Sequence, residues 1–342
     1  MPTVVTKTVK SSGGNYSSLS AWEAGEQGNL VTADEIREAE CYSFQDTTQV
    51  LINGSTTDST RYMRIFTPTS ERHDGKYNTS KYRLELSDQH AMMLGDAYVR
   101  VEGIQVKVTL ATNSVHHITA IMGLWNFALA SGTSQRVSHC VVVCDATGRT
   151  DNSNLRGFFI EAGASSTAPV PILYVWNCMV LHIGSGAGYN DHKGFHCGGQ
   201  DGDMVVYNCT ADDFDFGYHK AGSNTSFLVK NCLASNSSIG FNANGSSFAA
   251  GSDYNVTTDA TSPPGSNSDT SSTVSFVDSA NGDFHLLSSD TGAKDQGVDL
   301  SSDPTLAFST DIDGQTRSGT WDVGADEVVS DSSFPRRWAT AA

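Results

Sequence analysis

Short runs in which apolar and polar residues alternate, divided by turn residues, recur along most of the chain. An alternation with a period of two is typical of β-strands, because successive side chains of a strand point to opposite faces. The pairs Asn53-Gly54, Asp74-Gly75 and Gly95-Asp96 indicate turns between such runs. Before residue 110, strands are expected at residues 3–10, 36–42, 49–52, 62–66, 82–86 and 98–108.

A tetrapeptide ending in Asn-Cys occurs three times, at residues 175–178, 206–209 and 229–232. A glycine–aromatic pair follows each copy: Gly194-Phe195, Gly217-Tyr218 and Gly240-Phe241. The last two copies of both markers lie 23 residues apart (231 − 208 and 240 − 217). Two markers with one period indicate a structural repeat and predict the stacked rungs of a solenoid. Weaker copies at residues 137–142 and 157–159 extend the repeat toward the N-terminus.

The order of inward-facing and outward-facing side chains predicts a bend at each Asn-Cys pair. A straight strand with Cys232 inside would also bury Lys230, and a buried unpaired lysine is costly. With a bend, the valine ends one strand and the residues after the cysteine begin the next. Three columns are then expected to stack from rung to rung: Val175, Val206 and Val229; Asn177, Asn208 and Asn231; and the buried, unbridged thiols of Cys178, Cys209 and Cys232.

The two ends of the chain carry other patterns. A serine before Leu19, Trp22 and Glu23 predicts an N-cap and a short helix that ends at Gly28-Asn29 and covers the first rung. Residues 246–272, rich in Ser, Asn, Gly and Thr, are expected to form a long surface loop. The expected segments are an N-terminal strand and capping helix (1–34), rungs with inserted loops (35–272), a C-terminal closing module (273–329) and a tail (330–342).

The asparagine column resembles the ladder of the pectate-lyase-like right-handed parallel β-helix, in which each side-chain amide can bond to the next. The C-terminal run Phe284-His285-Leu286, Asp311-x-Asp313-Gly314-x-x-Arg317 and Asp322-x-Gly324-Ala325-x-Glu327 resembles the closing segments of phage and environmental bacterial β-helix proteins. The resemblance implies an all-β fold: a single-stranded right-handed parallel β-helix with a short N-terminal capping helix and a C-terminal closing module.

Composition narrows the function classes. The formal net charge is −17, which disfavours binding to nucleic-acid phosphates. No run of about 18 apolar residues exists, so membrane insertion is not expected. The first ten residues lack the apolar core of a signal peptide, so we expect the protein to begin in the cytoplasm. Seven cysteines, an odd number, do not suggest a disulfide framework.

The best candidate for chemistry lies on two adjacent rungs. Alternation over residues 213–219 places Phe214, Phe216 and Tyr218 inward and Asp213, Asp215 and His219 outward. Aligning Gly194 with Gly217 then adds His192 and His196 to one outward patch. Carboxylates with a histidine could perform acid–base work on a glycosidic bond, and several histidines with an aspartate could hold a transition metal. We favour a third interpretation, a solvent-facing, non-catalytic polar surface.

Motifs of related enzymes are incompletely matched. Polygalacturonase-like hydrolases carry Asp-Asp, Gly-His-Gly and Arg-x-Lys, and this chain has only the pair Asp212-Asp213. Pectate-lyase-like enzymes need calcium-binding acids and an arginine base on a neighbouring rung, where Arg156 is the nearest arginine. The acids Asp311 and Asp313 resemble part of a calcium loop, although a structural turn is favoured. No cofactor is expected.

These patterns favour a structural or adhesive virion protein of a tailed bacteriophage, such as a tail spike, fibre or capsid decoration. It would assemble in the host cytoplasm, contact other virion proteins or a cell-surface glycan, and form a homotrimer. The alternatives are a polysaccharide-degrading depolymerase, lyase or glycosidase, and a secreted bacterial adhesin.

Overall fold

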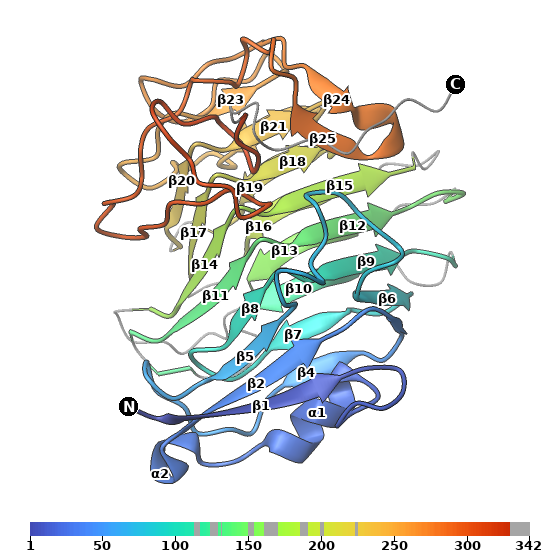
Figure 1. The fold of residues 1–342 in the computed structure, drawn as a ribbon. Coiled ribbons are helices and arrows are strands. Elements are labelled where there is room, and N and C mark those ends of the chain that lie inside the picture. The colour runs from blue at the N-terminus through green and yellow to red at the C-terminus, as the bar shows by residue number, and fades with distance from the viewer. Residues whose placement is uncertain are drawn as a thin grey trace.

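Three parallel β-sheets wind the chain into a right-handed solenoid (Figure 1). The computed structural model describes residues 1–112, 117–123, 129–130, 132–149, 154–160, 170–184, 191–198, 202–222 and 225–328. The predicted tail at residues 330–342 lies outside them. Each rung takes one strand from sheet I, then one from sheet II, then one from sheet III, so the prediction of an all-β parallel β-helix is confirmed.

The strands of each sheet pair only in parallel. Sheet I consists of β1 (Thr3–Val9), β2 (Glu35–Cys41), β5 (Met63–Phe66), β8 (Arg100–Glu102), β11 (Ser134–Ser138), β14 (Ile172–Trp176), β17 (Asp203–Tyr207) and β20 (Phe227–Lys230). Sheet II consists of β3 (Gln45–Asp46), β6 (Arg83–Ser87), β9 (Gln105–Thr109), β12 (Val141–Asp145), β15 (Met179–Ile183), β18 (Thr210–Asp212), β21 (Leu233–Ser235) and β23 (Val256–Thr257). Sheet III consists of β4 (Val50–Ile52), β7 (Met92–Leu94), β10 (His117–Gly123), β13 (Asn154–Ile160), β16 (Lys193–Cys197), β19 (Phe216–Lys220) and β22 (Ile239–Asn242).

The valine column stacks as predicted. Val175 pairs with Val206, and Val206 pairs with Val229, in the register of sheet I. All three side chains are fully buried. Each parallel rung therefore adds one aliphatic layer to a continuous core.

A left-handed residue turns the chain from sheet I to sheet II in six successive rungs. These residues are Gly103, His139, Asn177, Asn208, Asn231 and Tyr254, with φ between 45° and 69°. Glycine and asparagine enter this region more easily than other residues, which explains the repeated Asn. One consequence is that the expected strand at 98–108 is two strands, β8 and β9, with Gly103 between them.

The thiol of each cysteine that follows this corner forms a hydrogen bond across it. The Sγ atoms of Cys178, Cys209 and Cys232 each donate to the carbonyl two residues earlier, at 3.3 Å. All seven cysteines of the chain are buried and free. Burial raises the pKa of these thiols, so they remain protonated and pack as small apolar groups.

In each glycine–aromatic pair, both residues lie on the inner side of the strand, which a regular strand would not allow. The rings of Phe158, Phe195, Tyr218 and Phe241 stack with centroids 5.1, 4.9 and 4.7 Å apart. A Cβ on Gly194 would lie 2.7 Å from the carbonyl oxygen of Gly217 and 2.9 Å from the Cβ of Ala211. The repeated glycine therefore makes room for the aromatic stack beside it.

Helix α1 (Leu19–Glu26) covers the first rungs, as predicted. The Ser18 hydroxyl accepts a hydrogen bond from the Ala21 N–H, and the side chains of Leu19 and Trp22 are fully buried. A second, one-turn helix, α2 (Leu30–Ala33), follows with Asn29 as its N-cap. It was not predicted, because four residues are too short to show a helical period. No helix among the described residues is long and apolar enough to span a bilayer.

The last rung is covered by the segment predicted as a surface loop. This segment contributes β23 and the fully buried Asn255, and Phe248 packs against Phe227 and Phe241. The prediction of a plain surface loop is therefore wrong. The cause is that the open end of a solenoid needs apolar cover, which a few aromatic and aliphatic residues in a polar segment can supply.

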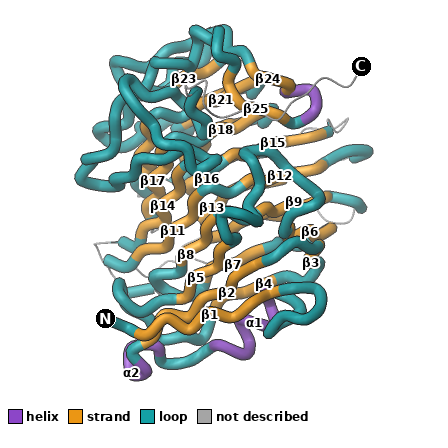
Figure 2. Tube along the Cα trace, viewed as in Figure 1, coloured by secondary structure: helices purple, strands orange, loops and turns teal. Residues whose placement is uncertain are grey.

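The closing module runs back along the solenoid instead of capping its end. It contains the antiparallel strands β24 (Phe276–Asp278) and β25 (Asp283–Leu286), joined by the 3-10 turn η1 (Ser279–Asn281). Its remaining loops gather over the upper rungs (Figure 2). Leu300, Leu306 and Trp321 pack on Val205 and Tyr207 of β17, and Phe284 and Ile312 belong to the cluster that contains Val141 and Met179 on sheet II.

The asparagine side chains of the column form more hydrogen bonds with this module than with one another. Asn231 donates to the Oδ1 of Asn208 at 3.0 Å, as a ladder requires. Asn208 instead donates to the carbonyls of Asp322 and Gly324, and the Oδ1 of Asn177 accepts from Arg317. The continuous amide-to-amide ladder implied by the resemblance is therefore only partly formed, because backbone and arginine groups of the module occupy the other amide positions.

We predict that Gly194→Ala lowers the free energy of unfolding by about 1–3 kcal/mol, because the added methyl group meets backbone oxygen and Ala211 in a packed core. Gly28→Ala is the matched control, since a Cβ there meets nothing within 4 Å. Urea unfolding of both variants checks the prediction. Equal stability of the two variants would show that the glycine is not required for packing.

Candidate functional site

Sheet III carries a group of cations, imidazoles and aromatic rings on its outer face. Because Gly194 and Phe195 point inward, Lys193 and His196 lie on the outer side of β16. In the register of the sheet, Lys193 pairs with Arg156 and Phe216, and His196 pairs with Phe159 and His219. These six residues are called the sheet III patch below.

His196 is the most unusual member of the sheet III patch. Its side chain is 6% exposed and lies between the rings of Phe159 and His219, with both centroids 4.9 Å away. Neither ring nitrogen of His196 has a hydrogen-bond partner among the described residues. Buried polar groups are almost always bonded, and leaving one unmade costs about 1–3 kcal/mol. The imidazole thus offers a donor and an acceptor that would suit a hydroxyl group of a bound molecule.

At neutral pH the histidines of the patch are uncharged, whereas its lysine and its arginine carry positive charges. Burial, followed by the charge of Arg156, lowers the pKa of His196 well below 6.5. Burial and Lys193 lower the pKa of His219 to about 4. The Lys193 ammonium pairs with Asp191 at 2.6 Å, and the Arg156 guanidinium lies 4.3 Å from the centre of the Phe159 ring. Since Asp191 balances the charge of Lys193, the face offers mainly neutral polar groups and aromatic rings to a bound molecule.

The expectation that His192, His196, Asp215 and His219 face solvent together is wrong. His192 is 2% exposed and His196 is 6% exposed, while His219 and Asp215 are half-buried. The cause is that Gly217 and Tyr218 both lie on the inner side of β19, as Gly194 and Phe195 do in β16, which interrupts the assumed alternation. As a result Phe216, expected inside, stacks on His219 at 4.9 Å outside the sheet.

A second group lies where sheet II turns into sheet III. The rings of His182 and His192 stack at 4.5 Å, and the Nδ1 of His182 is 3.4 Å from a carboxylate oxygen of Asp213. Beside them, Asp212 accepts a hydrogen bond from Asn236, and burial raises its pKa to about 6. Sequence reasoning missed His182. Its alignment with Cys144 on β12, an inward position, was the signal that could have found it.

The candidate catalytic acids have mainly structural contacts. An Asp215 oxygen accepts from the backbone N–H of His192 at 2.8 Å, and thereby fixes the start of β16. Asp213 is exposed at the corner, next to His182. The sheet III patch itself contributes bases and cations but no carboxylate. Its chemistry is that of a binding surface.

The structure brings three possible metal ligands together in the closing module. Among the described residues, His285, Asp313 and Asp326 are the one group of His, Cys, Asp or Glu whose ligand atoms all lie within 4.8 Å of one another. The His192, His196, Asp215 and His219 set does not meet this geometry. Asp311 instead accepts from the N–H groups of Asp313 and Gln315, which makes the turn that the sequence favoured.

His285 itself can supply the positive charge in this group. Its two ring nitrogens contact Asp283 and Asp313, the latter at 3.0 Å. Although burial opposes protonation, these carboxylates raise the pKa of His285 to about 11. An imidazolium between two carboxylates explains the cluster as an ion-pair network within the module.

We predict that His196→Phe leaves the free energy of unfolding at pH 7 unchanged or raises it, because the native imidazole has no hydrogen bond to lose within the part of the chain that the structure describes. The control is His73→Phe. His73 is 4% exposed and bonds through both nitrogens, to the carbonyl of His139 and the N–H of Gly75. Urea unfolding should show a loss of about 1–3 kcal/mol for His73→Phe alone. An equal loss for His196→Phe would contradict a binding role for the ring.

We also predict that His196 contributes to acid sensitivity. Since its folded pKa lies below the ordinary 6.5, the unfolded chain takes up a proton that the folded chain does not, and stability falls as pH drops below 6.5. The His196→Phe variant should therefore lose less stability than the parent between pH 6.5 and 4. Identical slopes of stability against pH would rule out this assignment.

Neither the known protein-family models nor the curated protein sequences contain a match to this chain. One solenoid architecture supports many unrelated functions. The function must therefore be argued from the residues on its faces.

Proposed function

We propose that this protein is a structural or adhesive component of a tailed-phage particle, built on a pectate-lyase-like β-helix and able to hold a glycan without cleaving it. Its partners would be other virion proteins or a cell-surface glycan, and its assembly a homotrimer formed in the host cytoplasm. A stack of parallel rungs suits such a role, because each rung buries its backbone bonds and apolar face against its neighbours and resists proteolysis.

The sheet III patch carries the proposal. Two neutral imidazoles, a lysine and an arginine lie among aromatic rings, and neither nitrogen of one imidazole has a partner in the described ranges. Sugar hydroxyls and carboxylates can bond to such groups, and aromatic faces favour stacking. Cleavage of a glycosidic bond instead uses two carboxyl groups that flank it. Asp215 is committed to the N–H of His192, and Asp191 is paired with Lys193.

A polysaccharide-degrading enzyme is the second candidate, and one observation favours it. Asp212, whose pKa is raised to about 6, neighbours Asp213 and His182 at the sheet II–sheet III corner. A carboxylic acid with a raised pKa is a common general acid. In this alternative Asp212 would donate a proton and Asp213 would act as the second carboxylate.

The two functions differ in turnover. The purified protein should retain one or more glycans of a panel of bacterial capsular and plant polysaccharides, with no release of reducing ends and no absorbance from unsaturated products. Lys193→Gln should weaken that retention at least about tenfold. Lys294→Gln, which removes a charge from the exposed end of an ion pair with Asp295, is the control and should bind normally.

Sustained product release that disappears in Asp212→Asn would establish the enzymatic alternative and refute ours. Absence of both retention and turnover would remove the adhesive role and leave a structural one. Sedimentation equilibrium tests the assembly, for which a mass of one 36.4 kDa chain would contradict the trimer.

A further inference from the structure

The outer face of sheet I carries a column of arginines. Arg64 pairs with Arg100, and Arg100 pairs with Arg136, in the register of β5, β8 and β11. The three residues are spaced by 36 (100 − 64 and 136 − 100), and each precedes an inward aliphatic residue. Successive rungs lie roughly 4.8 Å apart, so the guanidinium groups project from neighbouring strands of one flat surface.

Only one of these arginines is neutralised. Arg64 contacts carboxylate oxygens of Glu38 and Glu102 at 2.9 and 2.7 Å. Arg100 donates to the Tyr62 hydroxyl at 2.9 Å and to the carbonyl of Ser59. Arg136 lies 5.2 Å from the centre of the Tyr174 ring. In the part of the chain that the structure describes, no carboxylate pairs with Arg100 or Arg136.

Two unneutralised cations in register are unfavourable unless something compensates them. Like charges on directly opposite residues of adjacent strands destabilise a sheet. In a chain whose net charge is −17, acidic residues that could pair with these arginines are abundant, yet none of those described forms an ion pair with them, and Glu102 on the same strand pairs with Arg64 and Arg72. The ring of Tyr62 holds the Arg100 guanidinium at 3.6 Å, so this cation is pre-positioned. An external anion would relieve the repulsion.

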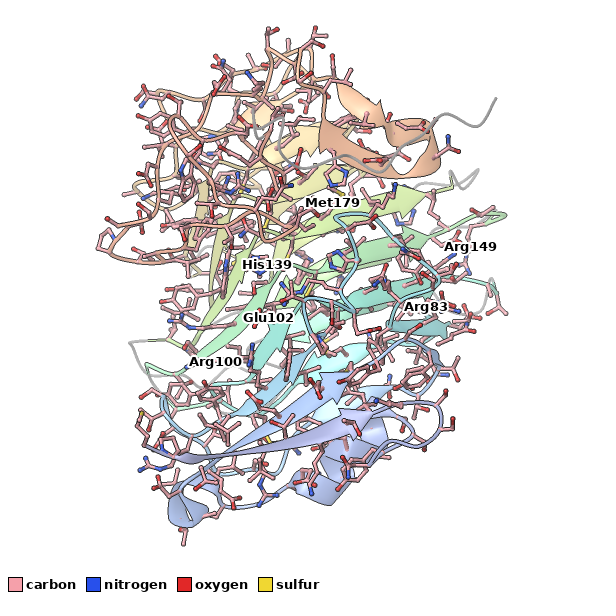
Figure 3. All side chains as sticks on the ribbon, in the orientation of Figure 1. Arg83, Arg100, Glu102, His139, Arg149 and Met179 are labelled. Atoms are coloured by element: carbon pink, nitrogen blue, oxygen red, sulfur yellow. The ribbon has the colours of Figure 1, made fainter. Side chains whose placement is uncertain are left out.

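The surface around these two arginines is left open by the closing module. The module packs on the next rungs of sheet I, through Leu300, Leu306 and Trp321 against Val205 and Tyr207. Figure 1 shows its loops over β17 and β20, while β5 and β8 lie below them. In Figure 3 the label of Arg100 lies at the side of β8, away from these loops. Arg100 and Arg136 are half-buried by their neighbours in the sheet.

We propose that Arg100 and Arg136 form a binding site for the carboxylate groups of an acidic polysaccharide that lies along the outer face of sheet I. Each guanidinium fork can hold a carboxylate through two parallel hydrogen bonds. One carboxylate group of the polymer, with a single negative charge, would then lie opposite the one guanidinium group of each rung. The site is separate from the sheet III patch, and it rests on the proposed adhesive function only for its biological purpose.

The experiment measures binding of polygalacturonate to the full chain at low salt, with the methyl-esterified polymer as the uncharged comparison. Polygalacturonate should bind, the ester should not, and the affinity should fall as salt rises. Arg100→Gln and Arg136→Gln should each raise Kd at least about tenfold. Arg136→Lys, which keeps the charge and loses the fork, should lie between Arg136→Gln and the parent.

Arg61→Gln is the matched control, because it removes the same charge from an arginine already paired with Asp34 and Asp58. It should bind as the parent does, and urea unfolding should confirm that every variant is folded. Binding that survives Arg100→Gln and Arg136→Gln, binding of dextran sulfate without polygalacturonate, or no binding would each overturn the proposal. Loss of polygalacturonate binding in Lys193→Gln alone would assign the polymer to the sheet III patch, and so reject this site while retaining the adhesive function.

Discussion

The left-handed corner between sheet I and sheet II is the constraint on which the rest of the structure depends. Six rungs place a residue with positive φ at this point, and in three of them it is a fully buried asparagine. The corner lets the valine before it and the cysteine after it both face the core, because it reverses the phase of the strand. It also leaves side-chain amides inside the protein, where unbonded polar groups would cost about 1–3 kcal/mol each.

The position of the closing module is explained by the hydrogen bonds that it forms with these buried amides. Arg317, whose side chain is fully buried, donates to the Oδ1 of Asn177 and to the carbonyls of Gly324 and Ala325, and its charge is balanced by Glu327. The same module covers the apolar outer surface of the upper rungs. Because the module covers the upper rungs, the outer face of sheet III and the lower rungs of sheets I and II remain for function.

Sequence periodicity predicted the features that repeat, since stacking makes equal demands on equal positions. The valine and cysteine columns, the bend at Asn-Cys and the helix at Leu19 followed from such patterns. The position of His196 could not be predicted, because it depends on two consecutive inward residues, Gly194 and Phe195. The arginine column was readable from its spacing of 36 residues, although whether each arginine has a carboxylate partner required the structure.

Native-state hydrogen exchange tests most directly the claim that corner and module form one cooperative unit. The backbone amides of Asn177, Asn208 and Asn231 donate to the next rung, and that of Gly324 donates to the Asn231 carbonyl. We predict that these amides exchange slowly and with the same opening free energy, because the asparagine side chains are also bonded to the module. Exchange of residues 311–327 at rates near those of an unprotected chain, while the corner amides remain protected, would contradict it.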